Sequence, residues 1–302
     1  MESHFSNQIE ELQFSADWQA ELLQFSPGPL GHRYSAIDLG AIRIEYIQCA
    51  AAVQVFDVHR APYLSFGVVT NGDAPSKFLA HPIERGDAIV WRPQDSLAYE
   101  YITPTNLSGY IIMVSTALAE ERGWSLKPTR LMKSADDSHK VLTKLSHGLA
   151  SGHLKSIKSM ATLFLNALET AYGSQLFIDQ DTSPADASAE VFKLVQHAKS
   201  YLRNFDSDEL ENIDALANIM GVSRRSLYRA FQQWPGVGPA RYSRFLRLAA
   251  ARRDLLERSP QSSSVMAISL EHGFHHTGRF AAEYRDFFGE SPVATLRKAN
   301  LV

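Results

Sequence analysis

The sequence predicts an α+β protein in which a strand-rich first part is followed by an all-helical second part. The chain has 302 residues, of which 45% are hydrophobic and 21% charged, a composition typical of a globular protein large enough for two cores. Short segments of alternating, β-branched or aromatic residues fill residues 37–114. From about residue 136 onward, apolar residues recur at helical spacing instead.

The strand-rich part contains several short segments separated by turn residues. Residues 43–47 alternate between polar and apolar side chains, and residues 63–70 are aromatic and β-branched. Asn71-Gly72, a dipeptide typical of tight turns, predicts a hairpin between 63–70 and 77–80. Further strand-like segments follow at 88–91, 98–102 and 110–114. Many short strands without helices between them indicate a small sandwich or barrel.

Two amphipathic segments after the strands predict a helix pair. Their apolar residues either form a dimer seam or pack on the strands, because both are ordinary uses of an amphipathic helix. The residues concerned are Leu145, Leu149, Ile157, Phe164 and Leu168. Residues 179–189 are polar, contain a proline and hold no large apolar residue, which is typical of a linker. We therefore expect one domain at 1–178 and a second at 190–302.

Charge is distributed unevenly between these two parts. The formal net charge is −3 overall, yet residues 190–302 hold 16 Lys and Arg against 12 Asp and Glu. The C-terminal part is therefore at +4 and the remainder at −7. A basic C-terminal part suits nucleic-acid binding, but four excess charges do not identify it without a motif.

The single cysteine and the chain start bear on the cellular compartment. Cys49 excludes an internal disulfide and a multi-cysteine zinc site, and its apolar neighbours indicate a buried structural thiol. No basic start with an apolar stretch marks a secretory signal, and no apolar run is long enough to span a membrane. We expect a cytoplasmic protein.

Two similar units occur in the C-terminal part. Residues 213–222 match residues 265–274 in pattern, with Gly221 corresponding to Gly273 at a distance of 52 positions. Each unit has a small residue for close helix packing, a glycine that relaxes the turn and an apolar residue that anchors it. A second helix follows directly in each, and a connecting helix is predicted from about Pro239 to Leu256. The pattern predicts two helix-turn-helix units.

The residues that build these units extend over nearly the whole C-terminal part. They are Ile213, Leu216, Ala217, Gly221, Ser223, Arg225, Leu227, Arg229, Phe231, Arg247, Leu248, Leu255, Leu256, Gly273, Phe274, Phe280, Tyr284, Phe288, Gly289, Ser291 and Pro292. In these positions the chain resembles the DNA-binding domain of the AraC/XylS family of bacterial transcription regulators. The resemblance implies that each unit places its second helix in a major groove of DNA.

The family's base-reading positions in the first unit fall on Arg225, Tyr228 and Arg229. Arginine holds guanine O6 and N7 with two hydrogen bonds, which discriminates between bases. Arg224 and Ser226 are the phosphate candidates beside them.

The second unit departs from the family's pattern. Gly278 and Ala282 stand where family members often carry a polar residue and an arginine, and neither side chain hydrogen-bonds to a base. Arg279 remains as the base candidate, with His276 and Thr277 as phosphate candidates. We expect this unit to contribute mainly phosphate contacts and shape reading.

The N-terminal strands and helix pair resemble the regulatory half of this family, which is a cupin-like β-barrel that holds an effector, with helices that form the dimer. The effector-pocket candidates are aromatic and polar residues on the strands, namely Tyr46, Tyr63, Phe66, Trp91, Arg92 and Tyr99. His59 and His81 are too isolated to be metal ligands, and the adjacent pair His275-His276 lacks a third ligand, so we expect no metal and no cofactor.

These observations predict a sequence-specific transcriptional regulator rather than an enzyme. The expected protein is an effector-responsive activator that binds double-stranded promoter DNA as a homodimer and contacts RNA polymerase. One alternative is a regulator of the same family without a small-molecule effector, controlled by a protein partner or by dimerisation alone. Another is a cupin-type enzyme fused to a DNA-binding domain, against which the missing metal triad argues.

Overall fold

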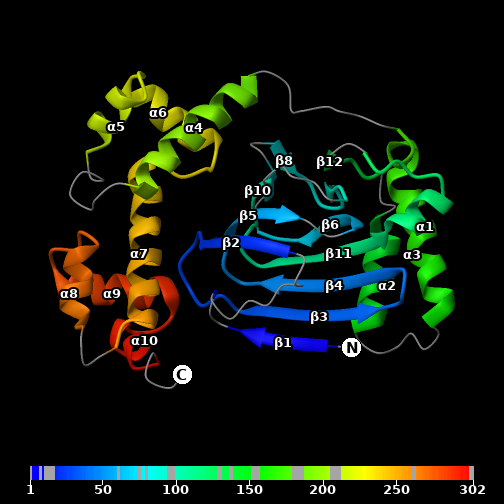
Figure 1. Cartoon of the computed structure of the whole chain (residues 1–302), viewed down its shortest axis with the longest axis horizontal. Coiled ribbons are helices and arrows are strands. Elements are labelled where there is room, and N and C mark those ends of the chain that lie inside the picture. The colour runs from blue at the N-terminus through cyan, green and yellow to red at the C-terminus, as the bar shows by residue number, and fades with distance from the viewer. Residues whose placement is uncertain are drawn as a thin grey trace. The chain divides into compact units, whose positions relative to one another are not determined.

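The chain forms two compact units in the computed structural model, which describes residues 2–6, 9, 18–59, 62–73, 76–78, 81–93, 99–127, 131–135, 139–150, 157–178, 187–204, 212–259 and 263–298 (Figure 1). The first unit comprises Met1–Leu22 and Leu30–Ser183. The second comprises Leu23–Pro29 and Pro184–Val302. The predicted α+β class is confirmed, with a sheet-rich N-terminal region and a helical C-terminal domain.

The first unit is built on two sheets. Their strands are β1 (Glu2–Ser6), β2 (Trp18–Gln24), β3 (His32–Asp38), β4 (Ile42–Cys49), β5 (Val53–His59), β6 (Tyr63–Asn71), β7 (Ser76–Phe78), β8 (His81–Ile83), β9 (Ala88–Trp91), β10 (Tyr99–Ile102), β11 (Leu107–Ser115) and β12 (Leu131–Met132). The seven-stranded sheet has the order β1-β3-β4-β11-β6-β9-β12, and the five-stranded sheet has the order β2-β5-β10-β7-β8. Within the described ranges each sheet keeps two edge strands, so the strands form two sheets and do not close into the cupin-like barrel that the family resemblance implied.

The predicted hairpin between residues 63–70 and 77–80 is wrong, because the two strands lie in different sheets. β6 pairs with β11 and β9, whereas β7 pairs with β10 and β8. β6 lies inside the seven-stranded sheet between β11 and β9, and most of its side chains are buried. The Asn71-Gly72 turn therefore carries the chain from one sheet to the other.

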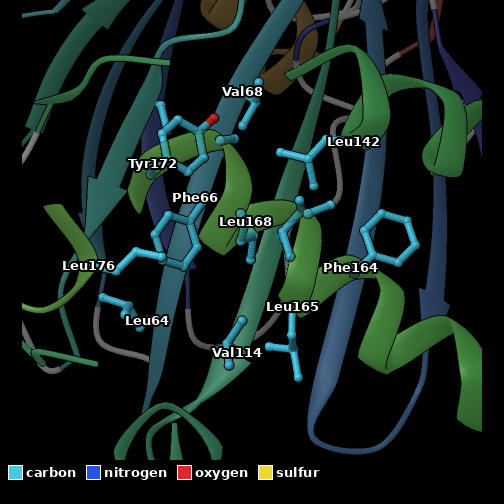
Figure 2. Packing of buried hydrophobic residues seen from close by; sticks show 14 of the residues in the cluster. Leu64, Phe66, Val68, Val114, Leu142, Phe164, Leu165, Leu168, Tyr172 and Leu176 are labelled. Carbon is cyan, nitrogen blue, oxygen red and sulfur yellow. The ribbon is translucent and has the colours of Figure 1, made fainter. Parts of the chain in front are cut away.

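Helices cover one face of the seven-stranded sheet. They are α1 (Thr116–Glu121), α2 (His139–Ala150) and α3 (Ile157–Tyr172), followed by a 3-10 turn at Gly173–Leu176. Phe164 and Leu168 of α3 are fully buried and pack in one continuous cluster with Phe66 and Val114 of the sheet (Figure 2). These two helix residues therefore pack on the strands, which was the second of the two uses considered for them.

Alternation along the strands divides the side chains of the seven-stranded sheet between its two faces. On β11, Ile112 belongs to the cluster beneath the helices, whereas Ile111 belongs to a different cluster. On β9, Val90 and Ile89 divide in the same way. This period of two is what a sheet with both faces covered produces. Cys49 is buried, as predicted for a structural thiol.

The second unit is helical. Its helices are α4 (Ala187–Asn204), α5 (Ile213–Ile219), α6 (Arg224–Gln233), α7 (Pro239–Glu257), α8 (Val265–Glu271), α9 (Thr277–Phe288) and α10 (Pro292–Lys298). The connecting helix α7 begins at Pro239, as predicted, and α5–α6 and α8–α9 lie near its opposite ends (Figure 1). Across the described ranges, no helix combines the length and the hydropathy needed to cross a lipid bilayer.

A short segment from the start of the chain completes the second unit. The ring of Phe25 lies 5.4 Å from that of Phe245 and 6.1 Å from that of Tyr242, measured between centroids. The side-chain amide of Gln24 donates a 2.7 Å hydrogen bond to the carbonyl of Phe287. Residues 23–29 are therefore part of the helical core, although they precede it by more than a hundred residues.

Candidate nucleic-acid interface

The two helix-turn-helix units share one backbone geometry at the turn. Gly221 and Gly273 adopt left-handed φ values of 68° and 73°, which side chains other than glycine rarely tolerate. In both units the residue after the glycine donates its N–H to the carbonyl five positions earlier, over 3.0 Å from Val222 and 2.8 Å from Phe274. The repeat found in the sequence is therefore a repeat of hydrogen bonds as well.

The small residue at each helix crossing is buried, as the packing of two close helices requires. Ala217 fills this position in the first unit and Ser269 in the second. The Ser269 hydroxyl donates a 2.8 Å hydrogen bond to the carbonyl of Met266, so its polar group is satisfied within α8. Serine replaces alanine here without an unsatisfied donor.

Helix α6 has three exposed arginines, of which Arg224 is paired with Asp214. Ser223 caps the helix by accepting a 3.1 Å hydrogen bond from the N–H of Ser226, and Leu227 and Phe231 turn toward the core. Arg225 and Arg229 are exposed, and within the described part of the chain neither makes an ion pair. Both guanidinium groups are available to an external partner.

The other predicted contacts on α6 already have partners within the chain. A guanidinium nitrogen of Arg224 lies 3.0 Å from a carboxylate oxygen of Asp214, and the same guanidinium lies 5.6 Å from the centre of the Tyr228 ring. The ring also adjoins Gly238, where an added Cβ would come within 3.1 Å of it. The hydroxyl of Ser226 lies 2.9 Å from that of Ser223. These contacts fix the positions of the side chains beside Arg225 and Arg229.

Helix α9 presents fewer polar groups. Its buried side chains are those of Phe280, Tyr284, Phe287 and Phe288. Arg279 is exposed, and Ala282 beside it is exposed as well. His276 stands at the N-cap without a side-chain hydrogen bond to the helix, and the Thr277 hydroxyl lies 3.5 Å from that of Ser269.

Arginines of α7 hold the second unit in place, a role that the sequence pattern did not reveal. Arg252 is buried, lies 2.8 Å from a carboxylate oxygen of Glu290 and stacks 4.7 Å from the centre of the Phe288 ring. Arg247 donates a 3.2 Å hydrogen bond to the carbonyl of Gly273, at the turn itself. Arg244 forms a bidentate ion pair with Glu283 of α9. Only the position of Arg247 within the matched motif gave a signal for this role.

The Glu290 carboxylate is the electrostatic centre of this arrangement. Burial alone raises the pKa of Glu290, but the hydrogen bond from Lys298 and the charge of Arg252 outweigh it and hold the pKa below its usual value. The Tyr284 hydroxyl, which receives a hydrogen bond from Arg252 and donates one to Thr295, belongs to the same network. The second unit is thus stabilised by buried charge, whereas the first displays its charge.

The candidates for an effector pocket are scattered over the N-terminal unit, which contains the two sheets. Trp91 lines a cavity between the two sheets, whereas Phe66 lies under the helices. Tyr46 packs against the helix-side cluster, Tyr63 packs against the cluster of Trp91, and Arg92 is buried. The side chain of Tyr99 falls outside the described residues, as do those of Leu149 and Ile157. Leu145 is partly buried against the helix-side cluster.

Comparisons with known proteins place the helical unit in a family. A family profile described as "Helix-turn-helix domain" matches residues 216–298. The chain is 36% identical over 133 residues to the "Probable thc operon regulatory protein" of Rhodococcus erythropolis, covering 44% of this chain and 37% of the relative. It is 39% identical over 90 residues to "XylDLEGF operon transcriptional activator 3" of Pseudomonas putida, covering 30% of this chain and 27% of the relative. These matches thus span little more than a third of the curated relatives at most.

A solved structure is matched over nearly its whole length. It is a transcriptional regulator from Chromobacterium violaceum described by its AraC-type DNA-binding domain, with 32% identity, a TM-score of 0.34, and coverage of 37% of this chain and 96% of that one. The residues matched by the family profile lie in the helical unit whose turns and caps are described above. Through this unit, the chain belongs to the AraC/XylS family of transcriptional regulators.

Proposed function

We propose that this protein is a sequence-specific transcriptional regulator that reads promoter DNA chiefly through helix α6. The observation that carries the proposal is the pair Arg225 and Arg229, which are exposed on one helix while their neighbours are tied to other residues. An arginine that enters a major groove gains two hydrogen bonds to guanine without breaking an ion pair of its own. Tyr228, held between Arg224 and Gly238, supplies an ordered surface beside them.

The second unit contributes affinity more than specificity in this proposal. Arg279 is the exposed arginine in the first turn of α9, and Gly278 and Ala282 offer no hydrogen bond to a base. His276 and Thr277 stand at the N-terminus of α9, where they suit a phosphate oxygen. The connecting helix has 19 residues, so at about 1.5 Å per residue it is roughly 28 Å long. With the width of the units added, this length suits two successive major grooves, which lie about 34 Å apart.

The remaining parts of the proposal concern the whole protein. The relatives' names support regulation of an operon, and one of them is named as an activator. We propose that this chain likewise activates transcription beside RNA polymerase, in the cytoplasm, as a homodimer and without catalytic activity. Because Phe164 and Leu168 are buried in the core, a dimer seam has to use the outer sides of α2 and α3, where Val141 and Leu163 are nearly half exposed. The cavity beside Trp91 favours control by a small molecule over control by dimerisation alone.

Selection from a random pool of DNA duplexes, followed by titration of the selected duplex, tests the proposal. Arg225→Ala should weaken binding to the selected duplex by about 1–3 kcal/mol, because one bidentate contact to guanine is lost. Its affinity for random duplex should change much less. Arg297→Ala removes an exposed arginine of α10 and is the matched control, with both affinities changed equally. Equal losses on both duplexes for Arg225→Ala would contradict base reading by this residue.

A further inference from the structure

In the N-terminal unit, the side chains do not fill the space between the two sheets. A cavity of about 110 Å³ lies there, lined by residues from both sheets. The apolar side chains around it form two separate clusters, one that includes Ile89, Trp91 and Ile111, and one that includes Val53 and Val55. On the opposite face of the seven-stranded sheet, the helix-side cluster is continuous. Protein interiors seldom leave a gap of this size unless something occupies it.

The lining of the cavity is almost entirely apolar. Among the described residues, no lysine, arginine, aspartate or glutamate belongs to the lining, and His32 is the one histidine in it. The Thr103 hydroxyl already accepts a 2.8 Å hydrogen bond from the N–H of Val53. The Cys49 thiol donates to the carbonyl of Leu30 over 3.4 Å, and burial raises its pKa to about 12, which keeps it neutral. The described lining therefore offers no lysine, arginine, aspartate or glutamate side chain to pair with a charged ligand.

We propose that this cavity binds an uncharged, apolar molecule about the size of one aromatic ring. An apolar cavity of roughly 150 Å³ is known to bind benzene, and this one is of the same order. A charged ligand would lose its hydration without gaining a counter-charge from a carboxylate, ammonium or guanidinium group of the described lining, so it should bind more weakly than an uncharged one. That the ligand is also the effector rests on the proposed regulatory function, whereas its binding in the cavity does not.

Trp91 gives the cavity a defined wall. The ring meets that of Tyr101 edge to face, with 5.8 Å between centroids, and is almost fully buried. Gly67 on the neighbouring strand leaves room for it, because a Cβ at that position would come within 2.5 Å of the ring. An aromatic wall fixed from both sides is suited to stacking against a planar apolar ligand.

Isoleucine methyl resonances of the full-length protein test the proposal, with benzene as the probe. Benzene should shift the methyl signals of Ile89 and Ile111, which line the cavity, and leave those of Ile44 and Ile112 in the helix-side cluster unchanged. Benzoate, which has the same ring with a negative charge, should bind at least tenfold more weakly. Absence of shifts, shifts in both sets, or equal binding of benzoate would overturn the proposal.

A cavity-filling variant adds a second measurement. Val55→Phe places a ring in the space, so benzene should no longer raise the melting temperature of this variant as it does that of the unaltered chain. If Val55→Phe does not fold, the methyl shifts of the unaltered chain still decide the question. Arg225→Ala should bind benzene as the unaltered chain does. Loss of selective DNA binding with benzene binding intact would defeat the proposed function alone, and the reverse result would defeat the cavity proposal alone.

Discussion

The two helix-turn-helix units have the same backbone and use their charges differently. Both turn at a left-handed glycine and close with the same hydrogen bond. The first unit leaves Arg225 and Arg229 exposed on α6, whereas the second receives Arg247 and Arg252 from α7 into its interior. A duplicated fold thus allows one copy to be specialised for contact with a partner and the other for stability.

Removal of the buried arginine should produce the largest difference in stability between the two helix-turn-helix units. Arg252→Ala removes the partner of Glu290 and the cation stacked on Phe288, and should destabilise the second unit by about 3 kcal/mol. Lys298 remains bound to Glu290, which keeps the loss at the lower end for a buried pair. Hydrogen exchange of the α9 amides during denaturant titration measures it. The exposed pair of the first unit is the control, and Arg224→Ala should cost less than about 0.5 kcal/mol.

Acid should destabilise the second helix-turn-helix unit before it affects the first. The pKa of Glu290 is lowered in the folded protein, so the unfolded chain binds the proton more readily and protonation favours unfolding. The stabilisation is complete above the ordinary carboxyl pKa of about 4.3 and is lost as the pH falls through the lower folded value. Glu290→Gln should remove this dependence of α9 exchange on pH between neutrality and acid. An unchanged pH profile in that variant would assign the acid sensitivity to other carboxylates.

The smallest changes in stability are expected at two glycines, one with a left-handed backbone and one within a helix. Gly221→Ala should destabilise the first unit by about 1 kcal/mol, because its φ of 68° is strained for alanine. Gly278→Ala should stabilise the second unit by about 0.5 kcal/mol, because this glycine is helical and an added Cβ meets no atom within 4 Å. Melting temperatures of the two variants should move in opposite directions. A fall in both would mean that Gly278 serves the backbone as Gly221 does.

Local signals explain why the helical unit was predicted well. A glycine that needs a positive φ, a cap such as Ser223 and a proline at the start of α7 each act within a few residues, so the pattern contains them directly. The strands were predicted less well, because pairing joins residues that are distant in sequence. Asn71-Gly72 has the chemistry of a hairpin turn, yet β6 pairs with β11 and β9, whose residues lie far from that turn in the sequence.

The candidate site divides in the same manner. The sequence placed Arg225 and Arg229 on the second helix of the first helix-turn-helix unit, and spacing alone was enough for that. It assigned Arg224 and Ser226 to phosphate contacts, but the ion pair of Arg224 with Asp214, which lies on α5, becomes visible only when the two helices pack. It also treated the arginines of α7 as part of a basic domain, whereas Arg252 is an interior residue.

The sequence by itself determined the class of the protein, its two helix-turn-helix units and the helix on which the proposed base-reading residues lie, because periodicity, caps and turn glycines are local properties. Only the tertiary structure decided which charges remain exposed, that a cavity separates two apolar clusters between the sheets, and that Phe25 packs in the helical unit. The physical reason is that burial depends on contacts between residues far apart in the chain, and no local pattern specifies which distant surface will cover a side chain.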